Sequence, residues 1–257
     1  MKTISKKDII KNFSKYAFSY EDHSAVQNEC AKKLLVMVND REAGRILEIG
    51  CGTGRFTQIL RQRFQFAEIT AVDISPEMIN TVKKKEIEGD VKFFVSDGEE
   101  LEKPNRYDLI VSNASFQWFN NLHGTIGRLK EMLSENGRLC FSMYGPETFR
   151  ELNEVLVCHY GSTGSVSSSQ FVSLLEIKRI LSEQFRSFDV RENFVTREYP
   201  SLMDFLREIK NSGTRGEGLG GNNFLGKNSI IEMEKIYVKK FGKIKVTHQV
   251  CFCEANV

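Results

Sequence analysis

The stretch LEIGCGTG, residues 47–54, decides the fold. Its apolar start is typical of a buried strand, and its three alternate glycines let the backbone turn sharply and approach a ligand. A helix directly after them would offer unpaired N–H groups at its first turn. A dinucleotide site would need G-x-G-x-x-G, whereas here the spacing is G-x-G-x-G and the acid Glu48 precedes Gly50 by two residues. Such an acid favours a ligand with a cationic amino-acid head, although a tight turn without a ligand stays open at this point.

Short apolar runs alternate with amphipathic segments around this stretch. Runs rich in Ile, Val, Leu and Phe are typical of strands buried on both faces of a sheet. They predict strands at 45–49, 68–73, 91–97, 107–113 and 137–144, with helices at 55–64, 76–85 and 122–133. We therefore expect an α/β fold, a Rossmann-like, doubly wound, mostly parallel sheet with helices on both faces.

The segments on either side of this core predict further elements. Residues 6–38 predict one or two helices with a break around Tyr20–Ser24. After the core we expect a flexible linker at 161–169, a Gly-rich segment at 211–223, helices at 146–159, 170–184, 201–210 and 229–241, and strands at 188–199 and 243–254.

We interpret the chain as one domain in three parts. These are an N-terminal helical lid (1–40), a cofactor-binding core (41–160) and a C-terminal segment (161–257) that contains a helical insertion and the last strands. An insertion between the last two strands is a natural place for a lid or a substrate-recognition element.

Composition narrows the function classes. The 257 residues carry a net charge of +2, whereas a dedicated nucleic-acid binder usually has a stronger basic excess. The start MKTISKKDIIKNF lacks the apolar core of a signal peptide, and no apolar run approaches a bilayer span, so we expect a cytoplasmic protein without membrane contact. No extra apolar face stands out, which favours a monomer.

The cysteines favour packing over metal binding. None of the six forms a C-x-x-C pair, so we expect no zinc site and no other metal. Cys251 and Cys253 alternate along a predicted strand, so both should point to one buried face in a reducing compartment.

Polar residues follow three further predicted strands. Asp73 ends the second strand, where an acid accepts hydrogen bonds from ribose hydroxyls; the competing role of helix N-cap falls to Ser75. Asp97 and Gly98 follow the third strand and suit an adenine ring, although an ordinary turn is an equal alternative. The fourth strand ends in SNASFQWF, residues 112–119. Because ligands of parallel sheets bind at the carboxyl ends of the strands, these motifs predict one crevice.

This ordered set over residues 45–145 resembles the class I S-adenosylmethionine-dependent methyltransferases. The resemblance implies a seven-stranded sheet whose last strand is antiparallel. It also implies a place for each end of S-adenosylmethionine. The methionine end would lie against the loop that contains Glu48, Gly50, Cys51, Gly52 and Gly54; the ribose and adenine would lie against Asp73, Ile74, Met78, Asp97 and Gly98, with Asn113 on the floor.

Four longer segments are similar to the malonyl-acyl-carrier-protein O-methyltransferases of biotin synthesis. They are FSKYAFSYEDHSAVQ (13–27), SNASFQWFNNL (112–122), FSMYGPETFRELNEV (141–155) and LREIK-x-x-G (206–213). The resemblance implies methylation of the free carboxylate of a malonyl thioester on an acidic acyl carrier protein. The acyl chain itself, and whether a coenzyme A thioester also serves, stay open.

This chemistry fits a chain without an obvious catalytic triad. A carboxylate has a pKa of about 4, is ionised at pH 7 and needs no general base. Alignment of the reacting atoms can supply ~7–11 kcal/mol. By resemblance Tyr20 closes the site and Asn113 and Gln117 border the transfer, so these three are our catalytic candidates, with Tyr16 beside them. Aromatic packing is the alternative for Tyr20, and His23 is interpreted as a structural hydrogen bonder.

The substrate anion needs a cation or several donors. Our substrate-binding candidates are Trp118, Tyr144, Arg207 and Lys210. Arg207 and Lys210 are spaced i, i+3 and share one helix face, which is equally well a solvated basic face. A second basic stripe comprises Lys2, Lys6, Lys7 and Lys11, and cations of either group would attract an acidic carrier protein.

Three other functions stay in competition. A class I methyltransferase for a quinone or a small carboxylic acid would share every cofactor residue. An adaptor that binds the cofactor without transfer is disfavoured by the intact Tyr20, Asn113 and Gln117. A nicotinamide oxidoreductase is disfavoured by the glycine spacing.

Overall fold

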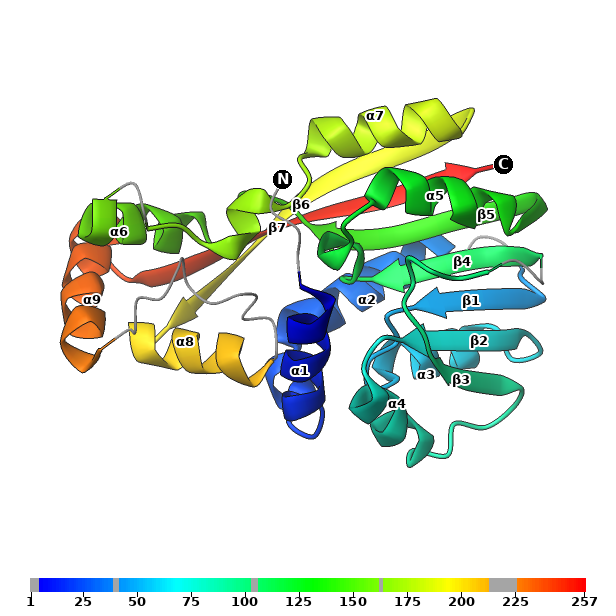
Figure 1. Ribbon diagram of the computed structural model, residues 1–257, viewed down its shortest axis with the longest axis horizontal. Coiled ribbons are helices and arrows are strands. Elements are labelled where there is room, and N and C mark those ends of the chain that lie inside the picture. The colour runs from blue at the N-terminus through cyan, green and yellow to red at the C-terminus, as the bar shows by residue number, and fades with distance from the viewer. Residues whose placement is uncertain (1–4, 39–41, 103–105, 162–163, 213–225) are drawn as a thin grey trace.

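The computed structural model describes residues 5–38, 42–102, 106–161, 164–212 and 226–257. Its centre is a seven-stranded sheet in the order β3-β2-β1-β4-β5-β7-β6 (Figure 1). β7 runs opposite to the other six strands, so the mostly parallel sheet with a reversed last strand is confirmed. The strands are β1 Arg45–Ile49, β2 Glu68–Asp73, β3 Val91–Val95, β4 Tyr107–Asn113, β5 Leu133–Tyr144, β6 Ser187–Tyr199 and β7 Ile244–Asn256.

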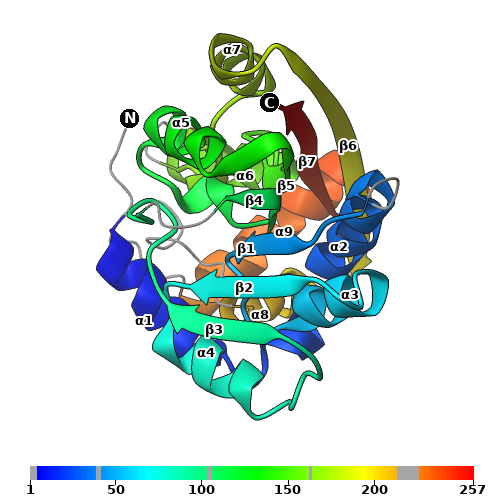
Figure 2. The same ribbon diagram turned by 90° about the vertical axis from the view of Figure 1, so that its right-hand side faces the viewer.

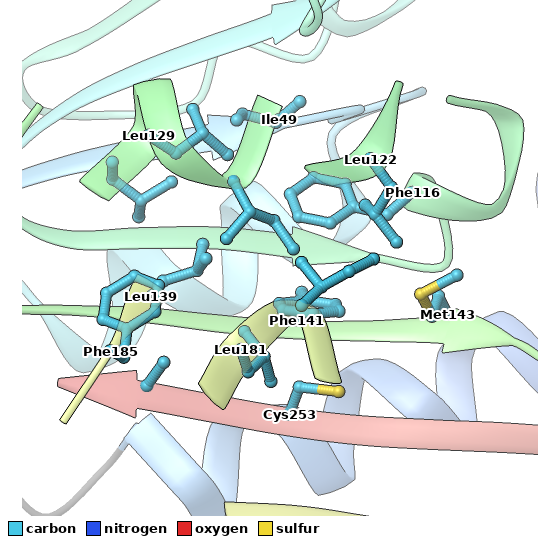
Figure 3. Close-up of a cluster of buried hydrophobic side chains, with 14 of the residues drawn as sticks. Ile49, Phe116, Leu122, Leu129, Leu139, Phe141, Met143, Leu181, Phe185 and Cys253 are labelled. Atoms are coloured by element: carbon cyan, nitrogen blue, oxygen red, sulfur yellow. The ribbon is translucent and has the colours of Figure 1, made fainter. Parts of the chain in front are cut away.

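Helices cover both faces of the sheet (Figures 1 and 2). Along β4 the buried side chains alternate, because Leu109 and Val111 join a cluster with α2 and α3, whereas Ile110 joins a cluster with α5 and α7. Figure 3 shows part of the second cluster. The helices are α1 Lys6–Tyr16, α2 Ala25–Val38, α3 Arg55–Arg63, α4 Pro76–Lys83, α5 Leu122–Glu131, α6 Arg150–Tyr160, α7 Leu174–Gln184, α8 Leu202–Asn211 and α9 Lys227–Phe241.

A second group of helices gathers where β6 and β7 extend beyond the other strands. Figure 1 shows α6, α8 and α9 together at this end, with α8 between α9 and α1. Their buried faces share one apolar cluster that includes Leu152, Phe205, Met233, Tyr237 and Val246. Two of these helices, α8 and α9, lie between β6 and β7, where the sequence predicts the insertion.

Local signals explain several element ends. Ser75 accepts a hydrogen bond from the Met78 N–H at the start of α4, so the predicted N-cap is confirmed. The predicted break in the N-terminal helices is the 3-10 turn η1, Tyr20–His23. The side chains of Cys251 and Cys253 are both buried in one cluster, as expected. Cys158, in contrast, is exposed.

Three sequence predictions need correction. The stretch 164–169 does not behave as a flexible linker, because Val166 and Ser168 are only 3% and 4% exposed and the 3-10 turn η4, Ser167–Gln170, follows. The helix predicted from residue 170 begins at Leu174, where Ser173 provides the N-cap. The strand predicted from residue 137 begins at Leu133, next to an irregularity in its pairing with β4.

Residues 213–223 of the Gly-rich segment lie outside the described residues, and 211–212 close α8. Over the described ranges, no helix is both long and apolar enough to span a bilayer.

Candidate active site

The glycine loop joins β1 to α3, and its glycines serve different purposes. Gly54 has φ +83°, and a Cβ there would lie 2.1 Å from Val82 Cγ2 of α4, so this glycine permits close packing of the helix. A Cβ on Gly52 would meet nothing closer than Tyr20 Cε1 at 4.0 Å. Gly52 therefore faces open space under η1.

A cavity of about 70 Å³ lies beside this loop at the carboxyl ends of the strands. We call it the strand-end cavity. It brings together most of the cofactor-binding candidates: Tyr20, Gly50, Gly52, Asp73, Ile74, Met78, Asp97, Gly98 and Asn113 all line it. Three cofactor-binding candidates are not among its described lining residues, namely Glu48, Cys51 and Gly54, and neither is the catalytic candidate Gln117.

Asp73 stands at the end of β2 and holds the glycine loop. Its Oδ2 accepts from the Gly52 N–H at 2.9 Å and its Oδ1 from the Ser75 N–H at 2.8 Å. Burial raises the pKa of Asp73 to about 6, and the two backbone donors act in the opposite direction. Because each carboxylate oxygen can accept a second bond, Asp73 still has acceptor capacity toward the cavity.

Glu48 lies behind the loop, where its side chain is 1% exposed. Its Oε2 accepts a 2.6 Å hydrogen bond from Thr57 Oγ1, which ties β1 to α3. Burial raises the pKa of Glu48 from 4.5 to about 8. Cys51 is buried close by, against Ala71 and Ile79. Neither residue reaches the strand-end cavity in this arrangement, so their predicted cofactor contacts stay predictions.

Asp97 lies at the opposite wall and is paired with Lys6 of α1. Lys6 Nζ is 3.2 Å from Asp97 Oδ1 and 2.5 Å from Glu99 Oε2, and it also lies over the Phe119 ring. The sequence assigns Lys6 to a basic stripe, and in the structure these contacts place it at the strand-end cavity. Lys2 of that stripe lies outside the described residues, while Lys7 and Lys11 belong to α1.

The segment from α1 to η1 covers the strand-end cavity. Figures 1 and 2 show α1 beside α4, and Ser14 Oγ lies 2.9 Å from Ser75 Oγ. Tyr20 lies over Gly52 and contacts the edge of Phe13. Burial raises the pKa of Tyr20, and the nearby Asp73 adds to this shift, so its hydroxyl stays protonated near pH 7.

Glu21 makes tertiary contacts that sequence reasoning missed. Its carboxylate accepts from Thr53 Oγ1 of the glycine loop at 2.6 Å and also pairs with Lys85 beyond α4. Lys85 and Thr53 lower the pKa of Glu21 against the opposing effect of its partial burial. Glu21 therefore joins η1 to the glycine loop by a hydrogen bond and to the segment after α4 by an ion pair.

The residues after β4 form the floor and one wall. Asn113 Nδ2 donates to the Gln27 carbonyl at 3.0 Å, and Asn113 Oδ1 accepts from Ser142 Oγ at 2.8 Å. Ala114, which also lines the cavity, has a left-handed φ of 52°, a conformation that strains a non-glycine residue. Gln117 Nε2 donates to the Ala114 carbonyl at 2.7 Å, so Gln117 braces this turn from outside the cavity.

A second cavity of about 420 Å³ lies under the helical insertion. We call it the insertion cavity. Among the substrate candidates, Trp118, Tyr144, Arg207 and Lys210 all line it, so the shared face of Arg207 and Lys210 is confirmed. Further lining residues are mostly apolar and include Phe149, Phe171, Phe205, Leu206 and Ile209.

The polar groups of the insertion cavity differ in their partners and in their burial. Arg207 pairs with Asp204 of the same helix at 2.8 Å. His23 Nε2 lies 3.2 Å from Asn211 Nδ2, which confirms His23 as a hydrogen bonder between η1 and α8. His248, which sequence reasoning missed, is 7% exposed, and burial lowers its pKa to about 4.

Trp118 and Gln27 line both cavities. The Trp118 ring meets Phe13 of α1 and Phe171 in edge-to-face contacts, with centroids 5.9 and 5.6 Å apart. Trp118 is therefore both a packing residue and the boundary between the two cavities. Trp118 and Gln27 thus mark the place where a ligand group in one cavity comes nearest to a group in the other.

Comparisons with known proteins agree with this arrangement. A family model described as a methyltransferase domain matches residues 23–184. The chain is 35% identical to malonyl-[acyl-carrier protein] O-methyltransferase 1 of Ilyobacter polytropus, covering 98% of this chain and 95% of the relative. It is 38% identical to the malonyl-[acyl-carrier protein] O-methyltransferase of Priestia megaterium, covering 82% of each.

Solved structures support the fold alone, because their sequence identities are low. The N-methyltransferase NodS of Bradyrhizobium japonicum, solved with S-adenosyl-L-homocysteine, superposes with a TM-score of 0.56 at 13% identity, covering 97% of this chain and 98% of that one. A putative methyltransferase of Bacillus halodurans gives a TM-score of 0.63 at 12% identity, covering 88% of this chain and 97% of that one.

Proposed function

The chain belongs to the malonyl-[acyl-carrier protein] O-methyltransferases, and from this premise we propose that it methylates the free carboxylate of a malonyl thioester on an acyl carrier protein, with S-adenosylmethionine as donor. One observation carries the proposal beyond the relatives' names. The strand-end cavity, with its glycine loop and acids, adjoins a larger apolar cavity, and the two share Trp118 and Gln27. A donor and an acceptor can thus meet at one boundary.

The residues of the strand-end cavity have the chemical types that S-adenosylmethionine needs. Gly52 leaves the loop open, and Asp73 retains acceptor capacity for ribose hydroxyls. The space is narrow, since about 70 Å³ falls below the range of roughly 300–1,000 Å³ for ligand pockets. We infer that α1 and η1 move outward when the cofactor enters and close again over it.

The chain's own residues would bind the donor and the acceptor, orient them toward each other and exclude water from the site. S-adenosylmethionine supplies a methyl group on a sulfonium, which passes to a carboxylate oxygen and leaves a neutral thioether without any proton transfer. Tyr20 and Tyr144 stay protonated because burial raises their pKa, so both can donate hydrogen bonds near the transfer. We propose that Asn113 lines the path of transfer and that Gln117 acts by holding the Ala114 turn.

The acyl group would occupy the insertion cavity. Its apolar lining suits a thioester and its arm, while Arg207 and Lys210 offer positive charge to an anionic end or to an acidic carrier protein. Methylation masks the carboxylate charge so that fatty-acid enzymes can extend the chain as a biotin precursor. The monomeric state and the cytoplasmic location stay predictions from the sequence.

The test supplies radiolabelled S-adenosylmethionine with malonyl-carrier protein, malonyl-coenzyme A and malonate in parallel. We expect a base-labile methyl ester on the carrier-bound malonyl group. No label on any of the three, with the cofactor still bound, would contradict the proposal. In that case the assay is repeated with a quinone and with other small acids. Label on one of these would mean that the same fold and cofactor site serve a different acceptor.

A further inference from the structure

A shallow groove runs between α8 and α9 on the outer surface of the insertion. It is lined by Met203, Lys227, Ile230, Ile231, Glu234, Lys235, Val238 and Lys239. Three of its apolar side chains are open to solvent, since Met203, Ile231 and Val238 are 39%, 47% and 46% exposed. An apolar strip of this kind with a polar rim is typical of a protein interaction site.

The rim of the groove is positively charged. Within the described residues, Lys227, Lys235 and Lys239 have no carboxylate within the 4.0 Å of an ion pair. Their neighbour Lys240 differs, because it points to α6 and pairs with Glu154 at 2.8 Å. Among the described lining residues the one acid is Glu234, which accepts the Leu202 N–H at the start of α8 at 2.8 Å. The groove therefore presents net positive charge around an apolar strip.

The groove is continuous with the proposed path of the substrate. Met203 and Ile230 line both the groove and the insertion cavity. Trp118 and Gln27 in turn line both the insertion cavity and the strand-end cavity. Shared lining residues thus connect the groove on α8 and α9, the insertion cavity and the strand-end cavity beside the glycine loop.

We propose that this groove is the docking surface for the acyl carrier protein, which places acidic side chains on the three lysines and an apolar patch on Ile231 and Val238. Its thioester-linked arm then enters the insertion cavity between Met203 and Ile230. Arg207 and Lys210 line the insertion cavity, so we place them against the arm or the acyl group after it has entered. This inference rests on the proposed function, because it takes its partner from it.

Charge reversal on the groove tests the proposal. The double variant Lys235→Glu/Lys239→Glu is compared with Lys178→Glu, an exposed lysine on α7, away from the groove. KM and kcat are measured with malonyl-carrier protein and with the malonyl thioester of N-acetylcysteamine, which has neither protein nor phosphate. We expect KM for the carrier substrate to rise about tenfold in the double variant, with kcat and the short substrate unchanged. Lys178→Glu should match wild type throughout.

Two further variants separate docking from other effects. Lys235→Gln/Lys239→Gln removes both charges without adding acids, and should raise KM for the carrier by a smaller factor while its S-adenosylmethionine affinity reports intact folding. Arg207→Glu should raise KM for both substrates, because Arg207 lines the cavity. Added salt should lower kcat/KM of wild type for the carrier and have less effect on the double variant. A KM within twofold of wild type in both lysine pairs would overturn the docking surface.

Failure of the docking surface is distinguishable from failure of the proposed function. If wild type transfers no methyl group to any malonyl thioester, the proposed function falls. Anisotropy of a labelled malonyl-carrier protein then still measures binding directly. Weaker binding by the groove variants would support the surface, and equal binding by all proteins would remove it.

Discussion

Lys6 Nζ lies 3.2 Å from Asp97 Oδ1, which joins the first turn of α1 to the end of β3. The Lys6 and Asp97 side chains are only 25% and 16% exposed, so this pair is better shielded from water than an ordinary surface ion pair. The carboxylate that the sequence assigns to adenine is therefore held by the segment that covers the cavity.

Replacement of Lys6 should weaken the attachment of α1 to the end of β3. In Lys6→Ala, we expect amide hydrogen exchange in α1 to become several-fold faster without cofactor, because the anchors at Asp97 and Glu99 are lost. Exchange is measured by mass spectrometry, with Lys11→Ala as a control at an exposed position of the same helix. Equal protection of α1 in wild type and Lys6→Ala would mean that packing, not the ion pair, holds the segment.

Loss of the Asp73 carboxylate should weaken cofactor binding. Asp73→Ala removes the proposed ribose acceptor and also frees the Gly52 N–H that the carboxylate holds. We expect the Kd for S-adenosylmethionine to rise at least about tenfold, because the free energy of one hydrogen bond to a charged group corresponds to about that factor. Calorimetric titration measures it, and a wild-type Kd in Asp73→Ala would sink the ribose assignment.

Glu48 should make the stability of the cofactor-free protein depend on pH. Its pKa is raised from 4.5 to about 8, so the folded state binds the proton more tightly than the unfolded state does. The resulting stabilisation is fully present below pH 4.5 and is lost as the pH rises through 8. Tm should therefore rise as the pH falls from 8.5 toward 6.5, by roughly several degrees.

Glu48→Gln is the matched variant for this effect. It keeps an oxygen that can accept from Thr57 Oγ1 but cannot ionise, so its Tm should vary less over the same pH interval. The interval stops near pH 6.5 because His248 acts with the opposite sign below it. The pKa of His248 is lowered from 6.5 to about 4, so protonation favours the unfolded state there. Parallel Tm curves for wild type and Glu48→Gln would contradict the assignment to Glu48.

The sequence predicts most of the sheet because its signals are local. Buried runs, glycines and the Ser75 cap lie within the elements that they define, and even the reversed last strand follows from the family resemblance. The prediction of a flexible linker over 164–169 is wrong, because a polar composition does not reveal that Val166 packs in the cluster of α6 or that Ser168 is buried and donates to the Thr148 carbonyl. A serine-rich stretch looks the same whether it is packed or free.

Long-range pairings in the site could not be predicted in the same way. Lys6 and Asp97 are 91 residues apart, and Glu21 meets Lys85 over 64 residues. Lys6 falls in a basic stripe and Lys85 follows the end of α4, so neither position by itself indicates a distant carboxylate partner. The candidates at strand ends were easier, because parallel strands bring their carboxyl ends to one edge whatever the loops do.

The two glycines Gly52 and Gly54 should separate ligand binding from folding. A Cβ on Gly54 would lie 2.1 Å from Val82 Cγ2, so Gly54→Ala must displace the Val82 side chain of α4 and should lower the free energy of unfolding by about 2–4 kcal/mol. Gly52→Ala meets only Tyr20 Cε1 at 4.0 Å and should cost about 1 kcal/mol, the strain of its positive φ. The new methyl group would, however, point toward the strand-end cavity.

Urea unfolding and cofactor titration of both variants test this separation. We expect Gly52→Ala to raise the Kd for S-adenosylmethionine more than its small loss of stability explains, because the methyl group occupies space that the ligand needs. Gly54→Ala should show the reverse balance, with a large stability loss and a smaller change in Kd for the molecules that stay folded. If Gly52→Ala binds the cofactor as wild type does, the ligand does not approach the loop at Gly52, and the methionine end must lie elsewhere along the strand ends.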